Sequence, residues 1–297
     1  MNALLLAAGY ATRLYPLTLH TPKPLLPVAG KPIAQYLVEQ LETIPEIGRL
    51  LVVTNHRFAA QFQAWAAGAS RRFQIEVVDD GTETNETRLG AIGDISFVLQ
   101  RHPALRHRPL FVLGGDNLVD FRLGDLVAAF LARGGAATVI ALVRARDPAE
   151  LSRSGVAALD ASGRVVEFVE KPGPAAAGAL AGPGQDPSTG GEVRRAAASP
   201  PAPPAGSALA RSLAQGEGLV CPPFYVFSPR ALALLPEYLA AGEPPDAPGH
   251  FIAWLHRRTA VYGHVFAEAR FDIGTPETYA TACRLFEARA SGGVPPR

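Results

Sequence analysis

Lysine is scarce in this chain: three of its 28 basic residues are lysines, and the rest are arginines. All three lysines lie in short proline-flanked motifs, with Lys23 in TPKPLLP, Lys31 in GKPI and Lys171 in VEKP. Lysine is a compact point charge, whereas arginine is a wide planar fork, so a narrow pocket that contacts one phosphate oxygen can require lysine. We expect Lys31 to be an exposed loop residue. Lys23 and Lys171 each lie beside a second motif that points to phosphate.

Cysteine is also scarce, and neither sign of charge dominates. Cys221 and Cys283 are far apart with no CxxC spacing, so neither a zinc site nor a disulfide framework is indicated. The formal net charge is +1 and there is no basic tract, which argues against duplex nucleic acid or an anionic membrane surface as a partner. The start MNALLLAAGYATRL is too short in its apolar part for a signal peptide or a membrane span, so we expect a cytoplasmic protein.

Apolar runs in the first half of the chain are typical of buried strands, and they alternate with segments of helical spacing. This alternation predicts an α/β fold of the Rossmann-like type, with a mostly parallel, doubly wound sheet. The chain is long enough to bury a large core. The expected strands are 3–7, 50–54, 75–78, 110–113 and 138–143, and the expected helices are 33–43, 59–67 and 123–133.

The second half of the chain shows a different pattern of expected strands. Residues 155–159 and 165–169 flank a hairpin turn signal, and 224–227 and 261–265 indicate further strands, so we expect a mixed sheet extended by antiparallel strands. A helix is expected over 229–241, and a last one begins near Pro276 with Thr275 as its N-cap.

We expect a single domain over residues 1–290. From 173 to 218 the composition is dominated by Pro, Ala, Gly and Ser, which cannot bury enough surface to offset the entropy of ordering. The segment 173–218 is therefore predicted to be a flexible surface insertion, and 291–297 a disordered tail.

The first chemical motif is the turn AAGYATRL, which begins at Ala7 directly after the first expected strand. Its backbone amides should lie at the carboxyl edge of the sheet, where such a turn can cradle a phosphate chain. The turn matches neither GxGxxG nor GxxxxGK[ST], which argues against a dinucleotide dehydrogenase and a P-loop ATPase. Arg13 and Lys23 follow on one loop stiffened by Pro16 and Pro22, and fixed cations of this kind serve phosphoryl chemistry.

The run LAAGYATRLYPLT followed by PKPLLPVAGKPI closely resembles the signature of the sugar-1-phosphate nucleotidyltransferases, the family of glucose-1-phosphate thymidylyltransferases and uridylyltransferases. Further motifs occur in the order of that family. They are GGDN at 114–117, SGV at 154–156, VEKP at 169–172, FYVF at 224–227 and FDIGTPE at 271–277.

The resemblance implies a Mg²⁺-dependent attack of a sugar 1-phosphate oxygen on the α-phosphorus of a nucleoside triphosphate, with release of pyrophosphate. Arg13 would neutralise the leaving pyrophosphate, and Lys23 would bridge the attacking phosphate and the α-phosphate. Asp116 and Asp272 would hold the Mg²⁺ ion, because carboxylates at a strand edge form a hard-oxygen site. The nucleotide would contact Ala7, Ala8, Gly9, Thr12, Leu89, Gly90 and Gly115, and the sugar phosphate would contact Asn117, Gly155, Glu170, Lys171 and Tyr225.

The chain also departs from the family pattern. Ala11 replaces a glycine, so we expect the turn to avoid a positive φ there. Ser154 replaces a tyrosine, and Arg270 stands where a tryptophan is common. The segment 79–94 occupies the base-reading loop but matches its better-known form only loosely, so the base and the sugar cannot be identified from it.

The leading interpretation is an enzyme that makes UDP-glucose or dTDP-glucose. Cytidylyl or guanylyl transfer to another phosphorylated acceptor is the alternative within the same class. A regulatory subunit that binds sugar nucleotides without turnover is the rival from another class, and the joint presence of Arg13, Lys23, Asp116, Lys171 and Asp272 argues against it. Self-association is left open.

Overall fold

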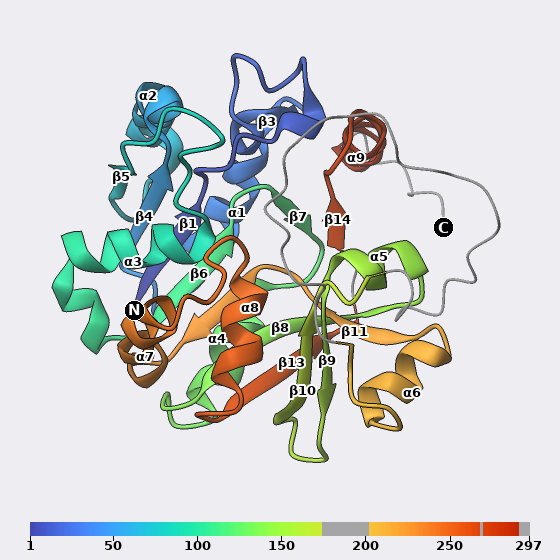
Figure 1. Ribbon diagram of the computed structural model, residues 1–297. Helices are drawn as coiled ribbons and strands as arrows, with labels where there is room; N and C mark the ends of the chain where they lie inside the picture. Colours follow the sequence, from blue (N-terminus) through green and yellow to red (C-terminus); the bar gives the residue numbers. More distant parts are fainter. Residues whose placement is uncertain (174–201, 268–269, 291–297) are drawn as a thin grey trace.

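A computed structural model describes residues 1–173, 202–267 and 270–290 of the chain. In this part, one mixed sheet runs through the molecule (Figure 1). Its strands are β1 (Asn2–Leu6), β4 (Arg49–Thr54), β5 (Ile75–Asp79), β6 (Leu110–Gly114), β8 (Thr138–Ala145), β9 (Gly155–Leu159), β10 (Val165–Glu170), β11 (Gly218–Cys221), β12 (Phe224–Phe227) and β13 (Val261–Phe266).

The strand order is β10-β9-β11-β8-β12-β6-β1-β4-β5, and β13 pairs with β8. Pairing is parallel among β6, β1, β4 and β5 and between β13 and β8, whereas the other pairs are antiparallel. The predicted α/β fold is confirmed: a Rossmann-like parallel half is extended by antiparallel strands. Two small ladders join β2 (Pro27–Val28) to β3 (Lys31–Pro32) and β7 (Asn117–Val119) to β14 (Arg270–Asp272).

Helices cover both faces of the sheet. The described helices are α1 (Ile33–Glu42), α2 (Ala59–Ala69), α3 (Ala91–Arg101), α4 (Leu123–Leu131), α5 (Pro148–Arg153), α6 (Ala208–Ala214), α7 (Pro229–Ala240), α8 (Pro248–Leu255) and α9 (Pro276–Ala290), with short 3₁₀ turns η1 (Thr12–Leu14), η2 (Lys23–Leu25), η3 (His56–Phe58) and η4 (Pro103–His107). None of these helices is long and apolar enough to cross a membrane.

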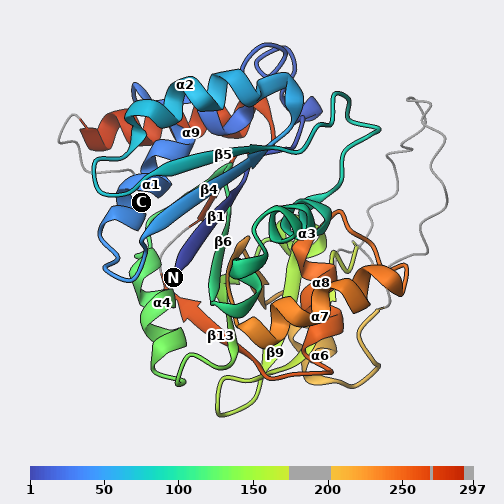
Figure 2. The same cartoon turned by 90° about the vertical axis from the view of Figure 1, so that its left-hand side faces the viewer.

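The central strands are apolar throughout because both of their faces are buried. On one face Leu5 and Val52 belong to a cluster with residues of α1, α2 and α4. On the other, Leu4 and Leu51 belong to a cluster with residues of α3, α7 and α8. Figure 2 shows these two groups of helices on opposite sides of the sheet.

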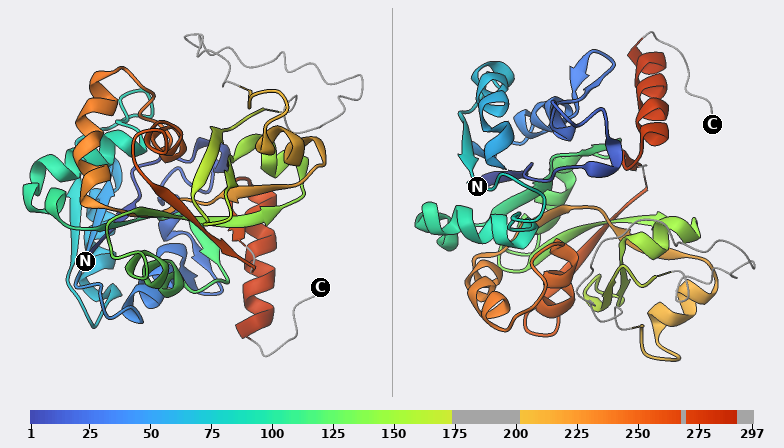
Figure 3. Two further views of the ribbon diagram at one scale, coloured as in Figure 1. Left: turned by 90° about the horizontal axis from the view of Figure 1, so that it is seen from below. Right: turned by 45° about the horizontal axis from the view of Figure 1, so that its top comes forward.

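The C-terminal helix α9 supports the N-terminal loop rather than the sheet (Figure 3). Ile273, just before it, is fully buried in a third cluster with Leu14 and Leu118. The hydroxyl of Tyr279 donates to the carbonyl of Pro27 at 2.6 Å. The Thr275 hydroxyl accepts from the Thr278 amide at 3.3 Å, which agrees with its predicted N-cap role.

The insertion predicted over 173–218 is wrong at its C-terminal end. Ser207 caps α6 by accepting from the amide of Ala210 at 3.1 Å. Leu209 and Leu213 are four residues apart on α6 and are 1% and 0% exposed. A two-residue apolar stripe therefore anchors a segment whose average composition suggested no core. Residues 174–201 and the predicted tail 291–297 lie outside the described residues.

Candidate active site

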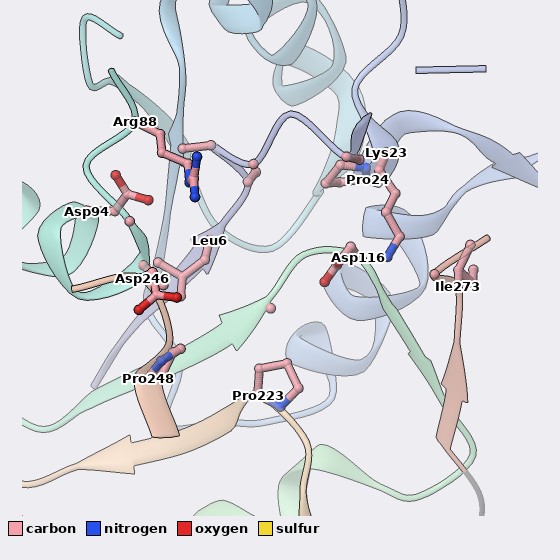
Figure 4. A pocket seen from close by; sticks show the side chains of 18 of the residues that line it. Leu6, Lys23, Pro24, Arg88, Asp94, Asp116, Pro223, Asp246, Pro248 and Ile273 are labelled. Atoms are coloured by element: carbon pink, nitrogen blue, oxygen red, sulfur yellow. Dashed lines mark hydrogen bonds and ion pairs between the residues drawn. The ribbon is translucent and has the colours of Figure 1, made fainter. Parts of the chain in front are cut away.

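A cavity of about 380 Å³ lies where the carboxyl ends of β1 and β6 meet (Figure 4). Its walls come from the turn after β1, η2, the turn after β6, the start of α3, the residue before β12, and the segments that lead into α8 and α9. Doubly wound sheets bind ligands at this edge because several loops converge there.

The turn after β1 is held in place by hydrogen bonds that two of its carbonyl groups accept. The side-chain amide of Asn55 donates to the Ala8 carbonyl at 2.9 Å, and the Thr18 hydroxyl donates to the Ala11 carbonyl at 2.9 Å. The amide N–H groups of residues 8–11 donate to no acceptor in the described part of the chain. An added Cβ on Gly9 would meet no atom within 4 Å, so open space, not a neighbouring side chain, lies beside this glycine. Such a turn can bind phosphate oxygens.

Ala11 has φ 48° and ψ 43°, so the expectation that it would avoid a positive φ is wrong. A non-glycine residue in this left-handed region costs about 1–2 kcal/mol. Its carbonyl also accepts from the Leu14 amide at 2.9 Å, in addition to the Thr18 hydroxyl. These two hydrogen bonds offset the cost and start the 3₁₀ turn η1, from which Arg13 lines the cavity.

Lys23, on η2, is the buried cation of the site. Its side chain is 9% exposed, and its Nζ donates to Asp116 Oδ2 at 2.7 Å. The side-chain amide of Asn117 donates to Asp116 Oδ1, also at 2.7 Å. These two hydrogen bonds orient the Asp116 carboxylate from both sides. The Asp116 side chain is 43% exposed and lines the cavity. Asn117, expected to contact the sugar phosphate, orients Asp116.

The two residues predicted to hold Mg²⁺, Asp116 and Asp272, come from neighbouring parts of the backbone at this edge. Asp116 lines the cavity, and the β14–β7 register brings the main chain of Asp272 opposite Asn117. Mg²⁺ takes one or two carboxylates and completes its shell with water and phosphate oxygens, so a two-carboxylate site is sufficient. Among the residues that the structure describes, no group of three or more His, Cys, Asp and Glu could hold a metal ion.

Glu170 and Lys171 lie at the end of β10, close to the start of α8. The Glu170 side chain is 9% exposed, and burial raises its pKa to about 7 against the opposing effect of Lys171, whose Nζ is 3.8 Å away. An added Cβ on Gly155 would lie 2.6 Å from Glu170 Oε2, and one on Gly249 would collide with the same oxygen. Gly155 therefore makes room for the carboxylate.

The cavity wall contains about half of the residues that the sequence predicted for the site. Tyr225 is buried in β12 and stacks on Phe227 with ring centroids 5.5 Å apart. The Gly115 amide donates to the Leu6 carbonyl at 2.9 Å, so this glycine joins β1 to the β6 turn. Ala7, Ala8, Gly9, Arg13, Lys23, Gly90 and Asp116 line the cavity, whereas Thr12, Leu89, Gly115, Asn117, Gly155, Glu170, Lys171 and Tyr225 do not.

Three charged residues of the wall were missed by the sequence interpretation: Arg88, Asp94 and Asp246. Asp94 lies in the first turn of α3 and is 5% exposed. The signal for it was its place in the segment 79–94, which the family resemblance assigns to the base-reading loop without singling out Asp94. Asp246 belongs to the loop before α8, which contacts the start of α3 because the Ile92 amide donates to the Pro245 carbonyl at 2.8 Å.

Similar proteins include mannose-1-phosphate guanylyltransferases. The chain is 33% identical over 174 residues to the catalytic subunit beta of that enzyme from Drosophila melanogaster, an alignment that covers 58% of this chain and 44% of that protein. It is 31% identical over 176 residues to the corresponding subunit from Dictyostelium discoideum, covering 58% and 45%. The chain thus spans less than half the length of these curated relatives.

The fold is similar to that of solved UDP-glucose pyrophosphorylases. One structure, complexed with UDP-glucose, has a TM-score of 0.68 at 18% identity, covering 97% of this chain and 98% of that chain. Another, from Acinetobacter baumanii, has a TM-score of 0.67 at 17% identity, covering 97% and 93%. The family described as nucleotidyl transferase matches residues 2–288 of this chain, so this protein belongs to the nucleotidyl transferase family.

Proposed function

We propose that this chain transfers a nucleoside monophosphate from a nucleoside triphosphate to a hexose 1-phosphate. The observation that carries the proposal is the convergence of a buried lysine, an arginine and unpartnered backbone amides on one cavity at the sheet edge. An oxygen of the hexose 1-phosphate forms a bond to the α-phosphorus. The bond from the α-phosphorus to the oxygen that bridges to the β-phosphorus breaks, and pyrophosphate leaves. The nucleophile is already an anion, so no general base is required.

The turn after β1 and Arg13 hold the triphosphate. Backbone N–H groups of residues 8–11 donate to phosphate oxygens, and the positive charge of Arg13 balances the charge that accumulates on pyrophosphate. Asp116 and Asp272 would hold Mg²⁺, which supplies further positive charge to the phosphate oxygens.

Lys23 positions the two reacting phosphates. An ammonium group has three N–H donors, and one of them is directed to Asp116. The other two can donate to the attacking phosphate and to the α-phosphate. Because Lys23 is buried and Asp116 is itself oriented by Asn117, the ammonium is held before the substrates bind.

The sugar end of the cavity is formed beside α8. Glu170 packs against Gly249, which follows the cavity residue Pro248. A carboxylate accepts hydrogen bonds from sugar hydroxyls, and Lys171 can pair with the sugar phosphate. Both residues lie just outside the cavity wall, so a bound hexose 1-phosphate would extend from the cavity toward them.

Two substrate pairs are supported. The curated relatives are named as mannose-1-phosphate guanylyltransferases, which favours GTP with mannose 1-phosphate. The similar folds include UDP-glucose pyrophosphorylases, and the second pair is UTP with glucose 1-phosphate.

The test is a panel of GTP, UTP, dTTP, CTP and ATP, each with glucose 1-phosphate or mannose 1-phosphate and Mg²⁺. Pyrophosphate release and nucleotide-sugar formation are measured together, and we expect both products in equal amounts from one pair. Excess EDTA should stop the reaction and added Mg²⁺ should restore it. Lys23→Met is the control that should abolish it. Binding of nucleotide sugars with no turnover for any pair would contradict the proposal and favour a regulatory role.

A further inference from the structure

A short two-stranded ladder carries part of the cavity wall. β7 begins at Asn117, directly after Asp116, and pairs with β14, which places the main chain of Asp272 opposite Asn117. Ile273 follows β14 and lines the cavity with Asp116, on the side of Lys23 (Figure 4). Each of the two strands has three residues. A ladder of this size is at best marginally stable by itself, so contacts with other elements have to fix its position.

Arg289, in the last turn of α9, holds the end of the ladder that lies away from the cavity. Its Nη1 donates to Asp120 Oδ1 at 2.5 Å, and its Nη2 donates to Asp120 Oδ2 at 2.9 Å. Asp120 is the residue directly after β7, and it lies 169 residues before Arg289 in the sequence. Two parallel hydrogen bonds between a guanidinium and a carboxylate fix the orientation of the partners as well as their distance.

The same guanidinium contacts the other strand of the ladder. Its Cζ lies 5.2 Å from the centroid of the Phe271 ring in β14 and 5.0 Å from that of the Phe286 ring in α9. The two rings meet edge to face with their centroids 5.6 Å apart. A cation beside aromatic rings is attracted by their quadrupoles. The side chain of Arg289 therefore joins β7, β14 and α9.

Helix α9 is also attached to the strand that follows Lys23. The hydroxyl of Tyr279 donates to the carbonyl of Pro27 at 2.6 Å, and Pro27 begins β2, four residues after Lys23. Both partners of the Lys23–Asp116 ion pair are thus connected to α9. Lys23 is connected through β2, and Asp116 is connected through β7 and Arg289.

On the basis of the proposed nucleotidyl transfer, we infer that Arg289 is a positioning residue, which through β7 holds Asp116 in place against Lys23. The Lys23 ammonium has to contact both reacting phosphates, and a displacement of about 1 Å from the reactive geometry can lower a rate about 100-fold. Loss of Arg289 leaves the backbone amides of residues 8–11 in place. It should therefore slow the reaction more than it weakens nucleotide binding.

Steady-state kinetics of the full chain, with the substrate pair that the nucleotide panel identifies, test this role. Arg289→Ala should lower kcat about 10-fold or more, whereas the Kd of the nucleotide, measured by calorimetry, should change less than about 3-fold. Arg289→Lys should have an intermediate kcat, because an ammonium keeps the charge but cannot form two parallel hydrogen bonds with Asp120. Arg284→Ala is the matched control, since Arg284 is exposed on the same helix and its Nη2 donates to Thr281 Oγ1 at 3.1 Å. It should change neither kcat nor Kd.

A double-mutant cycle with Asp120→Ala shows whether the effect passes through the ladder. Arg289→Ala and the double variant should have nearly the same kcat, because the removal of either partner already breaks the link. Additive losses of kcat, an unchanged kcat in Arg289→Ala, or a loss that only follows the folded fraction seen by circular dichroism would overturn the inference and leave nucleotidyl transfer intact. Absence of turnover in the folded wild type would contradict the proposed function itself, and with it this role of Arg289.

Discussion

Three lysines in this chain occupy three different environments. Lys23 is buried against Asp116, with 9% of its side chain exposed. Lys171 is half exposed beside Glu170. Lys31 pairs with Glu39 at 2.7 Å on the surface, and its Nζ lies 4.5 Å from the centroid of the Tyr36 ring. The need for a compact cation is therefore greatest at Lys23, whose charge is buried, and absent at Lys31.

We expect Lys23→Arg to lower kcat at least 100-fold, because a guanidinium cannot occupy the same buried position and still contact both phosphates. Lys31→Arg should leave kcat and KM within 2-fold, since arginine can also pair with Glu39 at the surface. Steady-state pyrophosphate release measures both. Equal tolerance at the two positions would mean that the buried ammonium is not part of the chemistry.

Arg13→Ala should lower kcat much more than it raises the Kd of the nucleotide. Its charge is matched to pyrophosphate as it leaves, so the interaction strengthens in the transition state. Loss of such a donor costs about 2–4 kcal/mol, or roughly 30- to 1000-fold in rate. Arg230→Ala, at an exposed position on α7, is the control. A variant that loses binding but keeps kcat would assign Arg13 to ground-state binding.

At the scale of elements, α6 shows how a small helix joins the core. It follows the Pro- and Ala-rich segment and packs beside β9, β10 and β11. Glu167 of β10 accepts from the amides of Ala208 and Leu209. These amides lie in the first turn of α6 and so have no acceptor within the helix. The helix thus packs on the antiparallel part of the sheet. A deletion in the Pro- and Ala-rich segment before it should therefore end before Ser207.

Leu213→Ala should lower the free energy of unfolding by about 2–5 kcal/mol, because it empties a fully buried position. Leu131→Ala is the matched control: this leucine ends α4 and is 45% exposed. It should cost less than about 1 kcal/mol. Urea denaturation measures both. Equal and small effects would show that α6 is not packed against the core.

At the scale of the whole molecule, stability should depend on pH through buried acids. The folded-state pKa of Asp94 is raised from 3.8 to about 8, and that of Glu170 from 4.5 to about 7. Each folded carboxyl binds its proton more tightly than the unfolded one does. Their contribution to stability is therefore fully present below about pH 4 and is lost as the pH rises through 7 and 8.

Asp94→Asn should flatten this loss, because the amide does not titrate. Four pH units at about 1.4 kcal/mol per unit set an upper limit of about 6 kcal/mol for Asp94. The variant should therefore be more stable than the wild type at pH 8.5, with little difference at pH 4. Thermal denaturation from pH 4 to 9 measures the slope, and the surface variant Asp125→Asn should keep the wild-type slope. An unchanged slope in Asp94→Asn would mean that Asp94 is ionised in the folded protein.

The sequence alone predicted most strands of the main sheet, more than half of the described helices, the order of the motifs and the candidate phosphate-binding residues at the edge of the sheet. These features depend on neighbours along the chain: apolar runs, the Thr275 cap and the turn that begins at Ala7 act within a few residues. The positions of Arg13, Lys23 and Asp116 followed from them, because a turn after a parallel strand must lie at its carboxyl end.

Tertiary structure decided which of these residues meet. Lys23 and Asp116 are 93 residues apart, and their ion pair exists because two loops converge at one sheet edge. Asp80 and Asp94 become a buried, hydrogen-bonded pair of acids only when the end of β5 and the start of α3 pack together, which no local pattern shows. Tyr225 is buried because β12 lies between β8 and β6 in the sheet. Burial and charge are set by distant neighbours, whose distances the linear sequence does not contain.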